Sequence, residues 1–146
     1  MPISTDDRSA IFDLISEYAY TFDEDRIDEL VNLFVDDAEW SICLSGSDTP
    51  TMKTSTNTER QTVFQDIRSG PINEAGMPRH FQTNTVLKRV SADRISGRTM
   101  VVATQQPYDG TQCRIVFSGV YEDEFVFSDA GWRFAVRRGL LDASSL

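Results

Sequence analysis

The sequence predicts an α+β fold in which N-terminal helices pack on one face of a curved antiparallel sheet. Two observations support this prediction. Apolar residues recur at helical spacing between Ile11 and Phe34, whereas the second half of the chain reads as long strands joined by short turns. Consecutive strands with such short turns pair in the antiparallel direction.

Two helices are expected at the start of the chain. The separation of Ser4 and Asp7 resembles a capping box. The apolar stripe of the first helix then consists of Ile11, Leu14, Ile15, Tyr18, Ala19 and Phe22. After the acidic segment 23–25, with Asp25 as N-cap, a short second helix is predicted to carry Ile27, Leu30, Val31 and Phe34. So short a link predicts a helical hairpin or corner.

The middle of the chain is predicted to hold one strand and one helix. Alternating apolar residues indicate a strand from Ala38 to Leu44, and residues 45–57 are rich in Ser, Thr and Pro, as loops are. Residues 58–69 are expected to form a third helix with Phe64 on its apolar side. The Gly and Pro content of residues 70–78 suggests a mobile lid.

Four strand segments are predicted in the remainder, at 80–90, 95–106, 112–127 and 132–138. Turn residues separate them, most clearly in the segment 107–110, which begins with Pro and ends with Gly. Met100 and Val102 alternate with Val101 and Ala103, so both faces of this strand carry apolar residues. Such a pattern fits a sheet that is buried on both sides.

Composition narrows the class of protein. The 146 residues suit one domain, and the net charge of −9 comes from acids spread along the chain, which argues against nucleic acid and anionic membranes as partners. No apolar run approaches the ~20 residues of a membrane span, and the N-terminus lacks the features of a signal peptide. We therefore expect a cytoplasmic protein. Cys43 and Cys113 have no zinc-site spacing, so no metal is expected.

His80 is the only histidine in the chain. Histidine has a free pKa of about 6.5 and is the natural acid or base near neutral pH, although a lone histidine is also common as a structural or surface residue. His80, Gln82 and Asn84 alternate along one strand and are predicted to share a face. Three polar side chains in a row are ordinary on a solvated face and notable on a cavity wall, and the sequence alone leaves both readings open.

Several motifs occur in a distinctive order: Ile11-x2-Leu14-x3-Tyr18-x4-Asp23, Leu33-Phe34-x2-Asp37-Ala38-x-Trp40, Arg79-His80-Phe81-x2-Asn84, Gly119-x-Tyr121-x-Asp123 and Gly131-Trp132-Arg133-Phe134. Together they resemble the SnoaL-like branch of the nuclear transport factor two-like superfamily. That branch includes scytalone dehydratase, polyketide cyclases, steroid and bile-acid dehydratases and a dehydrochlorinase. The resemblance spans nearly the whole chain and implies one SnoaL-like domain over residues 1–146.

The resemblance implies a cone-shaped, mostly antiparallel sheet, a cystatin-like roll, whose internal cavity is closed by the N-terminal helices. It places Asp23 and His80 opposite each other inside as the catalytic pair, whereas Asp23 taken alone reads as a solvated acid at a helix end. Candidate substrate-binding residues are Tyr18, Phe22, Trp40, Phe64, Gln82, Asn84, Gln105 and Tyr121. Phe22 replaces a tyrosine of scytalone dehydratase, and Gln105 replaces its second cavity histidine. Arg137 and Arg138 are expected on opposite faces of the last strand, with surface charge as the favoured role and contact of one of them with a ligand as the alternative.

The expected activity is that of a cofactor-independent lyase or isomerase: a dehydratase, isomerase or cyclase. A carboxylate bonded to one imidazole nitrogen leaves the other as a base, which can remove a proton next to a carbonyl. The expected substrate is a hydrophobic small molecule such as a polyketide, terpenoid or steroid-like intermediate of secondary metabolism. The alternative is a non-catalytic ligand-binding or dimerisation module of the same fold. A homodimer is expected, with a trimer as the alternative.

Overall fold

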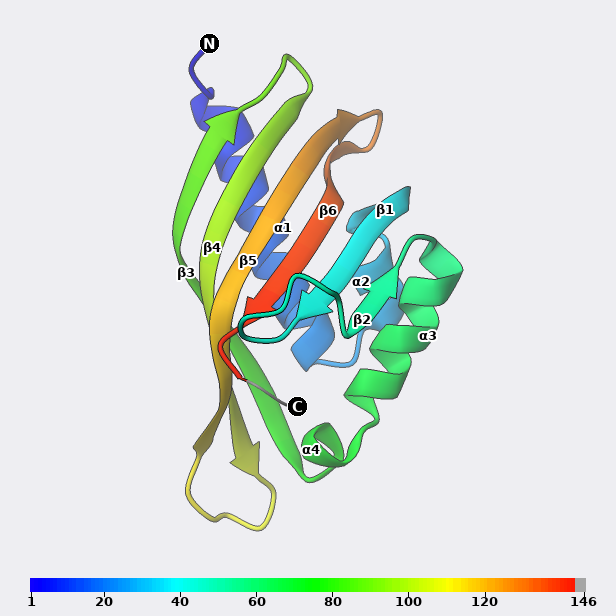
Figure 1. The fold of residues 1–146 in the computed structure, drawn as a ribbon, viewed down its shortest axis with the longest axis vertical. Coiled ribbons are helices and arrows are strands. Elements are labelled where there is room, and N and C mark those ends of the chain that lie inside the picture. The colour runs from blue at the N-terminus through cyan, green and yellow to red at the C-terminus, as the bar shows by residue number, and fades with distance from the viewer. Residues whose placement is uncertain (144–146) are drawn as a thin grey trace.

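A computed structural model gives the fold of the chain and describes residues 1–143. Six strands form one mixed sheet, and the helices lie against one of its faces (Figure 1). The helices are α1 (Thr5–Asp23), α2 (Ile27–Val31), α3 (Asn57–Arg68) and α4 (Pro71–Glu74). The strands are β1 (Phe34–Cys43), β2 (Met52–Thr54), β3 (Gly76–Arg89), β4 (Arg94–Pro107), β5 (Arg114–Ser128) and β6 (Gly131–Leu141).

The strand order is β2-β1-β6-β5-β4-β3. Strands β3 to β6 form the predicted antiparallel meander. Strand β1 joins β6 in the parallel direction, with Trp40 beside Arg137, and the short β2 pairs with the free edge of β1. The predicted class, an α+β fold with a mostly antiparallel curved sheet and N-terminal helices, is confirmed.

Bulges bend the long strands. The register between β3 and β4 shifts between Thr83 and Val86, where Asn84 adopts a φ of 57°. Further shifts interrupt the β4–β5 and β5–β6 ladders. A bulge increases the local twist and can re-aim a side chain, so these irregularities curl the sheet around α1, which passes behind β4 and β5 in Figure 1.

Helix α1 packs its predicted apolar stripe against the concave face of the sheet. The stripe is buried throughout, and the sheet meets it with buried aromatic and aliphatic side chains from every long strand except β3: Phe34, Trp40, Ile95, Val101, Tyr121, Phe125, Trp132 and Phe134. Among the described helices, none is long and apolar enough to cross a membrane.

The start of α1 is fixed to the sheet by Asp7. The Ser4 hydroxyl accepts from the Asp7 backbone N–H at 3.0 Å, as the capping prediction requires. The Asp7 carboxylate instead accepts from Trp132 Nε1 at 3.0 Å and from Arg89 Nη2 at 2.6 Å. The bond from Trp132 is the largest influence that lowers the pKa of Asp7. The predicted capping box is therefore only half formed, because the acid is used to join α1 to β6 and β3.

The predictions between the first helix and the first strand need correction. Asp25 is not an N-cap: it has a φ of 60°, and α2 follows Arg26, which makes no side-chain capping bond. Phe34 does not belong to the second helix but begins β1, where it pairs with Phe134 of β6. Tertiary pairing with β6 thus overrides a helical apolar spacing.

Two short elements lie where a loop and a lid were predicted. Residues 45–57 contain β2, and residues 70–78 contain α4 and the start of β3. Helix α3 begins as predicted, within a residue, and is capped by a full capping box between Thr56 and Glu59. Strand β2 has only three residues, so its pairing with β1 defines it better than its own composition.

Candidate active site

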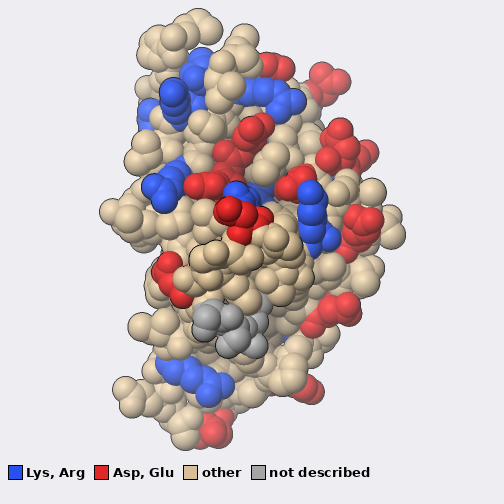
Figure 2. Space-filling view, in the orientation of Figure 1, with Lys and Arg blue, Asp and Glu red and all other residues tan. Residues whose placement is uncertain are grey.

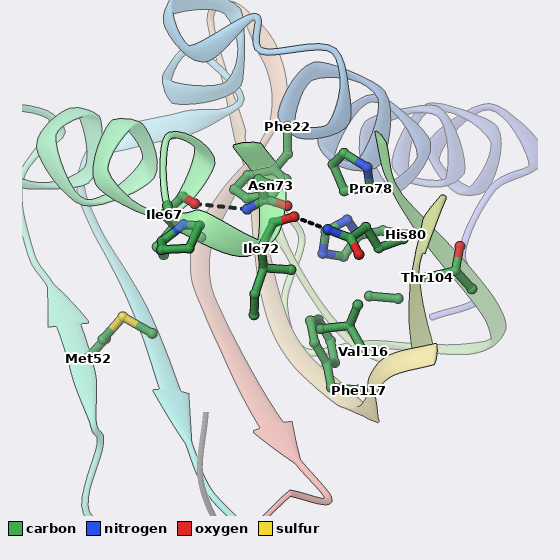
Figure 3. Close-up of a pocket in the computed structure, with 14 residues that line it drawn as sticks. Phe22, Met52, Ile67, Ile72, Asn73, Pro78, His80, Thr104, Val116 and Phe117 are labelled. Carbon is green, nitrogen blue, oxygen red and sulfur yellow. Dashed lines mark hydrogen bonds between the residues drawn. The ribbon is translucent and has the colours of Figure 1, made fainter. Parts of the chain in front are cut away.

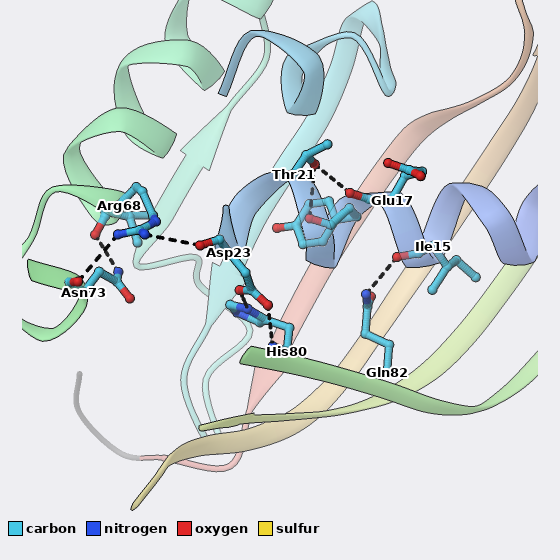
Figure 4. A network of polar contacts seen from close by, with 10 residues as sticks. Ile15, Glu17, Thr21, Asp23, Arg68, Asn73, His80 and Gln82 are labelled. Carbon is cyan, nitrogen blue, oxygen red and sulfur yellow. Dashed lines mark hydrogen bonds and ion pairs between the residues drawn. The ribbon is translucent and has the colours of Figure 1, made fainter. Parts of the chain in front are cut away.

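Asp23 and His80 form a buried pair where α1 ends and β3 begins. His80 Nδ1 lies 2.6 Å from Asp23 Oδ1, and the His80 backbone N–H donates to Asp23 Oδ2 at 2.8 Å (Figure 4). Asp23 is 2% exposed, and the side chain of His80 is 9% exposed. The resemblance predicted that Asp23 and His80 face each other, and in the structure they are in hydrogen-bond contact.

The pair is held in place from both sides. A carboxylate at a helix C-terminus is disfavoured by the helix dipole, so the two bonds from His80 stabilise Asp23 where the helix itself does not. Arg68 at the end of α3 donates through Nη2 to the Asp23 carbonyl at 3.2 Å and through Nη1 toward the Asn73 carbonyl at 3.5 Å. The rings of Phe22 and Phe117 meet the imidazole edge to face, with centroids at 5.1 and 5.7 Å. Phe22 therefore orients the ring by packing.

His80 faces a mostly apolar cavity with two adjoining parts. The larger part, which we call the outer chamber, has a volume of about 240 Å³ and lies between the end of α3, α4 and the ends of β4 and β5 (Figure 3). The smaller part, the inner chamber, has about 100 Å³ and reaches toward α1 and β1. Both chambers are lined by Phe22, Met52, Ile67, His80 and Phe117. His80 thus stands where the chambers adjoin.

The inner chamber ends at three polar aromatic side chains. Trp40 Nε1 donates to the Tyr18 hydroxyl at 3.0 Å, and the Tyr18 ring lies 5.8 Å from that of Tyr121. Burial is the largest cause that raises the pKa of Tyr18, and it raises the pKa of Tyr121 well above its ordinary range. Both hydroxyls therefore keep their protons at neutral pH and can donate hydrogen bonds.

Arg137 lies behind this end of the cavity and is fully buried, so the expectation of surface charge is wrong. It bonds Asp123 through Nε at 3.0 Å and Nη2 at 3.2 Å, and Nη2 also donates to Gln82 Oε1 at 2.7 Å. Its guanidinium carbon lies 4.1 Å from the Tyr18 ring centroid and 4.0 Å from that of Tyr121. The β5–β6 pairing places Asp123 opposite Arg137, beyond a register shift that the sequence pattern does not reveal.

The structure separates the predicted substrate-binding residues. Those that line the inner chamber are Tyr18, Phe22, Trp40 and Tyr121, and Phe22 also lines the outer chamber together with Gln105. Phe64 lines neither chamber, because its ring is fully buried against Tyr18, Phe34 and Trp40.

Gln82 and Asn84 also lie outside both chambers. Gln82 Nε2 donates to the Ile15 carbonyl at 2.8 Å, which joins β3 to α1. Asn84 is exposed at the bulge of β3, where Thr83 Oγ1 donates to its side chain at 2.7 Å. The prediction that His80, Gln82 and Asn84 share one face fails at Asn84, because the bulge interrupts the alternation.

Gln105 is fully buried and both ends of its amide are occupied. Its Nε2 donates to the Ile72 carbonyl of α4, and its Oε1 accepts from Arg114 Nε at 2.7 Å. Asn73 Nδ2 also donates back to the Ile67 carbonyl at 2.8 Å. These bonds hold the segment predicted as a lid against the outer chamber.

Sequence reasoning missed several cavity residues. Met52 comes from the unpredicted β2, while Ile72 and Asn73 come from the unpredicted α4. Phe117 lies in a predicted strand, but its direction depends on the register shift between Ala103 and Thr104. Among the residues that line the two chambers, His80 was the one that its residue type alone singled out, because it is the only histidine in the chain.

Comparison with known proteins assigns the chain to a family. A family model described as "SnoaL-like domain" matches residues 4–138. The chain belongs to the SnoaL-like domain family. Gamma-hexachlorocyclohexane dehydrochlorinase of Sphingobium indicum is 29% identical over 130 residues, which are 89% of this chain and 77% of that protein.

Solved structures of other proteins show the same fold. An NTF2-like protein with a cystatin-like fold from Novosphingobium aromaticivorans superposes with a TM-score of 0.76 and 22% identity, over 96% of this chain and 84% of the other. A scytalone-dehydratase-like protein from the same organism superposes with a TM-score of 0.75 and 23% identity, over 94% and 88%. The SnoaL-like chain described here therefore has the cystatin-like NTF2 fold that its sequence resembles.

Proposed function

We propose that this SnoaL-like protein is a cofactor-independent lyase or isomerase that acts on a hydrophobic small molecule by Asp23–His80 acid–base catalysis. The observation that carries the proposal is the 2.6 Å contact between His80 Nδ1 and Asp23 Oδ1 at the wall of an apolar cavity. No hydrogen bond within residues 1–143 uses His80 Nε2, which leaves this nitrogen for a ligand.

The chemistry follows from the tautomer that Asp23 selects. A neutral imidazole that donates Nδ1–H to a carboxylate presents a lone pair on Nε2. Nε2 can then take a proton from carbon next to a carbonyl, and the imidazolium that forms is stabilised by Asp23. The electron pair of the broken C–H bond moves toward the carbonyl oxygen, where negative charge develops. The hydroxyls of Tyr18 and Tyr121, which line the inner chamber, would donate hydrogen bonds to that oxygen.

The fate of the proton decides the reaction. Return of the proton to another carbon completes an isomerisation. Transfer to a departing hydroxyl gives dehydration, and expulsion of another leaving group gives a related elimination. Attack of the carbanion on a second carbonyl gives cyclisation. The dehydrochlorinase relative supports an elimination, because loss of hydrogen chloride likewise requires removal of a proton.

Turnover of defined compound classes tests this proposal. Wild-type protein is incubated with β-hydroxy ketones, β,γ-unsaturated ketones and chlorinated alicyclic compounds, and products are followed by absorbance and mass spectrometry. We expect turnover of at least one class and a loss of roughly 10²–10⁴-fold in His80→Gln, the contribution typical of a positioned acid or base. Full activity in His80→Gln would exclude His80 as the base.

The outer face of the sheet supports a second proposal, that the protein self-associates as a homodimer. Phe81 and Met100 are 53% and 55% exposed there, and with Val102 and Val120 they line a shallow depression. Figure 2 shows this face, where acidic and basic side chains lie side by side next to a broad uncharged area. Sedimentation velocity should give a dimer that Met100→Lys dissociates; a trimer, or an unchanged sedimentation coefficient in Met100→Lys, would contradict this proposal.

A non-catalytic module remains the competing function. The same exposed face favours it, because an assembly role needs only that surface. An assembly role does not require a buried contact between a carboxylate and an imidazole at a cavity wall, such as that of Asp23 and His80. Loss of turnover in His80→Gln, with the sedimentation coefficient unchanged, separates the two functions.

A further inference from the structure

We propose that the two chambers divide the ligand into two parts: a compact head with a hydrogen-bond-accepting oxygen in the inner chamber, and a larger apolar body in the outer chamber. This inference rests on the proposed function for the position of the reacting carbon beside His80. It adds the chemical class of the ligand, its orientation and the residues that limit its size.

The head is assigned from a count of hydrogen-bond donors. Trp40 Nε1 donates to the Tyr18 oxygen at 3.0 Å, which uses the Trp40 hydrogen and leaves the hydrogen of the Tyr18 hydroxyl itself. Within residues 1–143, no hydrogen-bond acceptor is found for the hydroxyl hydrogens of Tyr18 and Tyr121, whose side chains are 3% and 2% exposed and line the inner chamber. Because a buried donor without a partner is costly, this end of the cavity calls for an acceptor oxygen.

The size of each part follows from the volumes. A cavity of about 150 Å³ is enough to bind benzene. The inner chamber, at about 100 Å³, is smaller than that cavity, so we assign to it a carbonyl with a methyl-sized neighbour. The outer chamber, at about 240 Å³, is larger than that cavity, so we assign to it one ring with substituents.

His80 stands between the two parts. It lines both chambers, together with Phe22, Met52, Ile67 and Phe117. A ligand whose carbonyl reaches the tyrosines therefore places the carbon beside that carbonyl near the imidazole. Ile42 lines only the inner chamber and Val116 only the outer one, so these two residues set the limits of head and body separately.

The first experiment measures binding of two isosteric probes, acetophenone and α-methylstyrene, by calorimetry or ligand-observed NMR. They differ only in a carbonyl oxygen against a methylene group. Wild-type protein is expected to bind the ketone about fivefold more tightly, the net value of one neutral hydrogen bond. In Tyr18→Phe/Tyr121→Phe the preference should fall, because both hydroxyl donors are removed and only the Trp40 Nε1–H remains near the carbonyl.

Two results would overturn the oxygen-head assignment. Equal ratios in the wild type and the double phenylalanine variant would show that the hydroxyls do not receive the head. A preference for α-methylstyrene in the wild type would show that the free hydroxyl hydrogens serve a bound water instead. The unfolding midpoint of the variant verifies that it is folded, and Tyr121→Phe alone provides a milder variant in which the ratio should fall partway.

The second experiment tests the size limit with benzophenone, which carries a ring on each side of its carbonyl. We expect benzophenone to bind wild type at least tenfold more weakly than acetophenone, although its greater apolar area favours it. Ile42→Ala should recover most of that loss, and the matched Val116→Ala should not. Tighter binding of benzophenone to wild type, or equal recovery in both variants, would contradict the division; Ile42→Val replaces Ile42→Ala if that protein does not fold.

Failure of this inference can be told apart from failure of the proposed function. The probe ratios are binding measurements on compounds that need not be turned over, so they test the two-part ligand independently of catalysis. Loss of the ratio with intact His80-dependent turnover would remove only the two-part ligand. Intact ratios without any turnover would remove only the catalytic proposal.

Discussion

Two carboxylates of this protein are buried to a similar degree but have different partners. Asp23 is 2% exposed and contacts His80, while Asp123 is 4% exposed and bonds Arg137. An imidazole can lose its proton near neutral pH, whereas a guanidinium in a protein cannot. The pairs also differ in what lies next to them: His80 lines the cavity, and Arg137 is enclosed by aromatic rings.

This difference separates a reactive pair from a structural one. Taking charges out of water is expensive for both, and each carboxylate recovers stability from two hydrogen bonds. The Asp23 pair can relax by holding a neutral imidazole, which keeps a lone pair available on Nε2. The Asp123 pair has no neutral form of its cation, so its geometry fixes β5 against β6 and supports the tyrosines of the inner chamber.

The largest effect is expected for Asp23→Asn. An asparagine amide would donate to His80 Nδ1 and leave the ring proton on Nε2, which abolishes the base; the analogous change in the Ser-His-Asp triad costs about 10⁴-fold. We expect turnover to fall by roughly 10²–10⁴-fold while the free energy of unfolding falls by about 1 kcal/mol. Kinetics and urea unfolding of the same preparation measure both, and a stable, fully active variant would show that Asp23 has no part in the reaction.

A stability loss of about 3–5 kcal/mol is expected for Asp123→Ala, because it leaves the buried Arg137 Nε without an acceptor. Urea unfolding measures the loss. Asp123→Asn is the matched control: it keeps an acceptor oxygen in place and should cost much less. Equal losses in both variants would mean that the negative charge itself is required.

A smaller effect, about 1 kcal/mol, is expected for Arg68→Met. The substitution keeps the aliphatic stem but removes the bonds to the carbonyls of Asp23 and Asn73, so α4 should become more mobile. Hydrogen exchange in residues 70–75 reports that change, and Arg79→Met on the neighbouring exposed surface is the control. Unchanged exchange in α4 would show that Gln105 and Asn73 hold the segment without Arg68.

The smallest effect concerns pH. Desolvation raises the pKa of Asp123 above its ordinary value of 3.8, although Arg137 lowers it, so the folded state holds this proton more tightly than the unfolded chain does. The stability contributed by this group is therefore fully present below pH 3.8 and is lost as pH rises through the raised pKa. The free energy of unfolding of the wild type, relative to that of Asp123→Asn, should therefore fall as the pH rises from 3.8 through the raised pKa of Asp123, and urea titrations at several pH values measure it. A rise would mean that attraction by Arg137 dominates.

The long elements could be predicted from the sequence because their patterns are strong. The stripe of α1 and the alternation of the four long strands each repeat several times. The resemblance carried by the order of motifs predicted that Asp23 and His80 face each other, as they do in the structure. Strand β2 and helix α4 were missed because three or four residues carry too little pattern. Pairing with β1 defines β2, and the bond from Gln105 to the Ile72 carbonyl holds α4.

The direction of individual side chains was the hardest part. Asn84 was expected on the His80 face, but the bulge beside it turns it to solvent. Arg137 was expected at the surface, because an arginine is buried only where its partners are present, and those come from three other elements. Such placements depend on register shifts and long-range partners, which local pattern does not encode.

The central claim is that Asp23 fixes the tautomer of His80 and leaves Nε2 free toward the cavity. Because the chain has one histidine, its ring nitrogens can be observed by ¹⁵N NMR without assignment. Recorded where the ring is neutral, the spectrum should show a protonated Nδ1 and an unprotonated Nε2, and Asp23→Asn should reverse them. A ring protonated on Nε2 in the wild type, or equal populations of the two tautomers in both proteins, would contradict the claim.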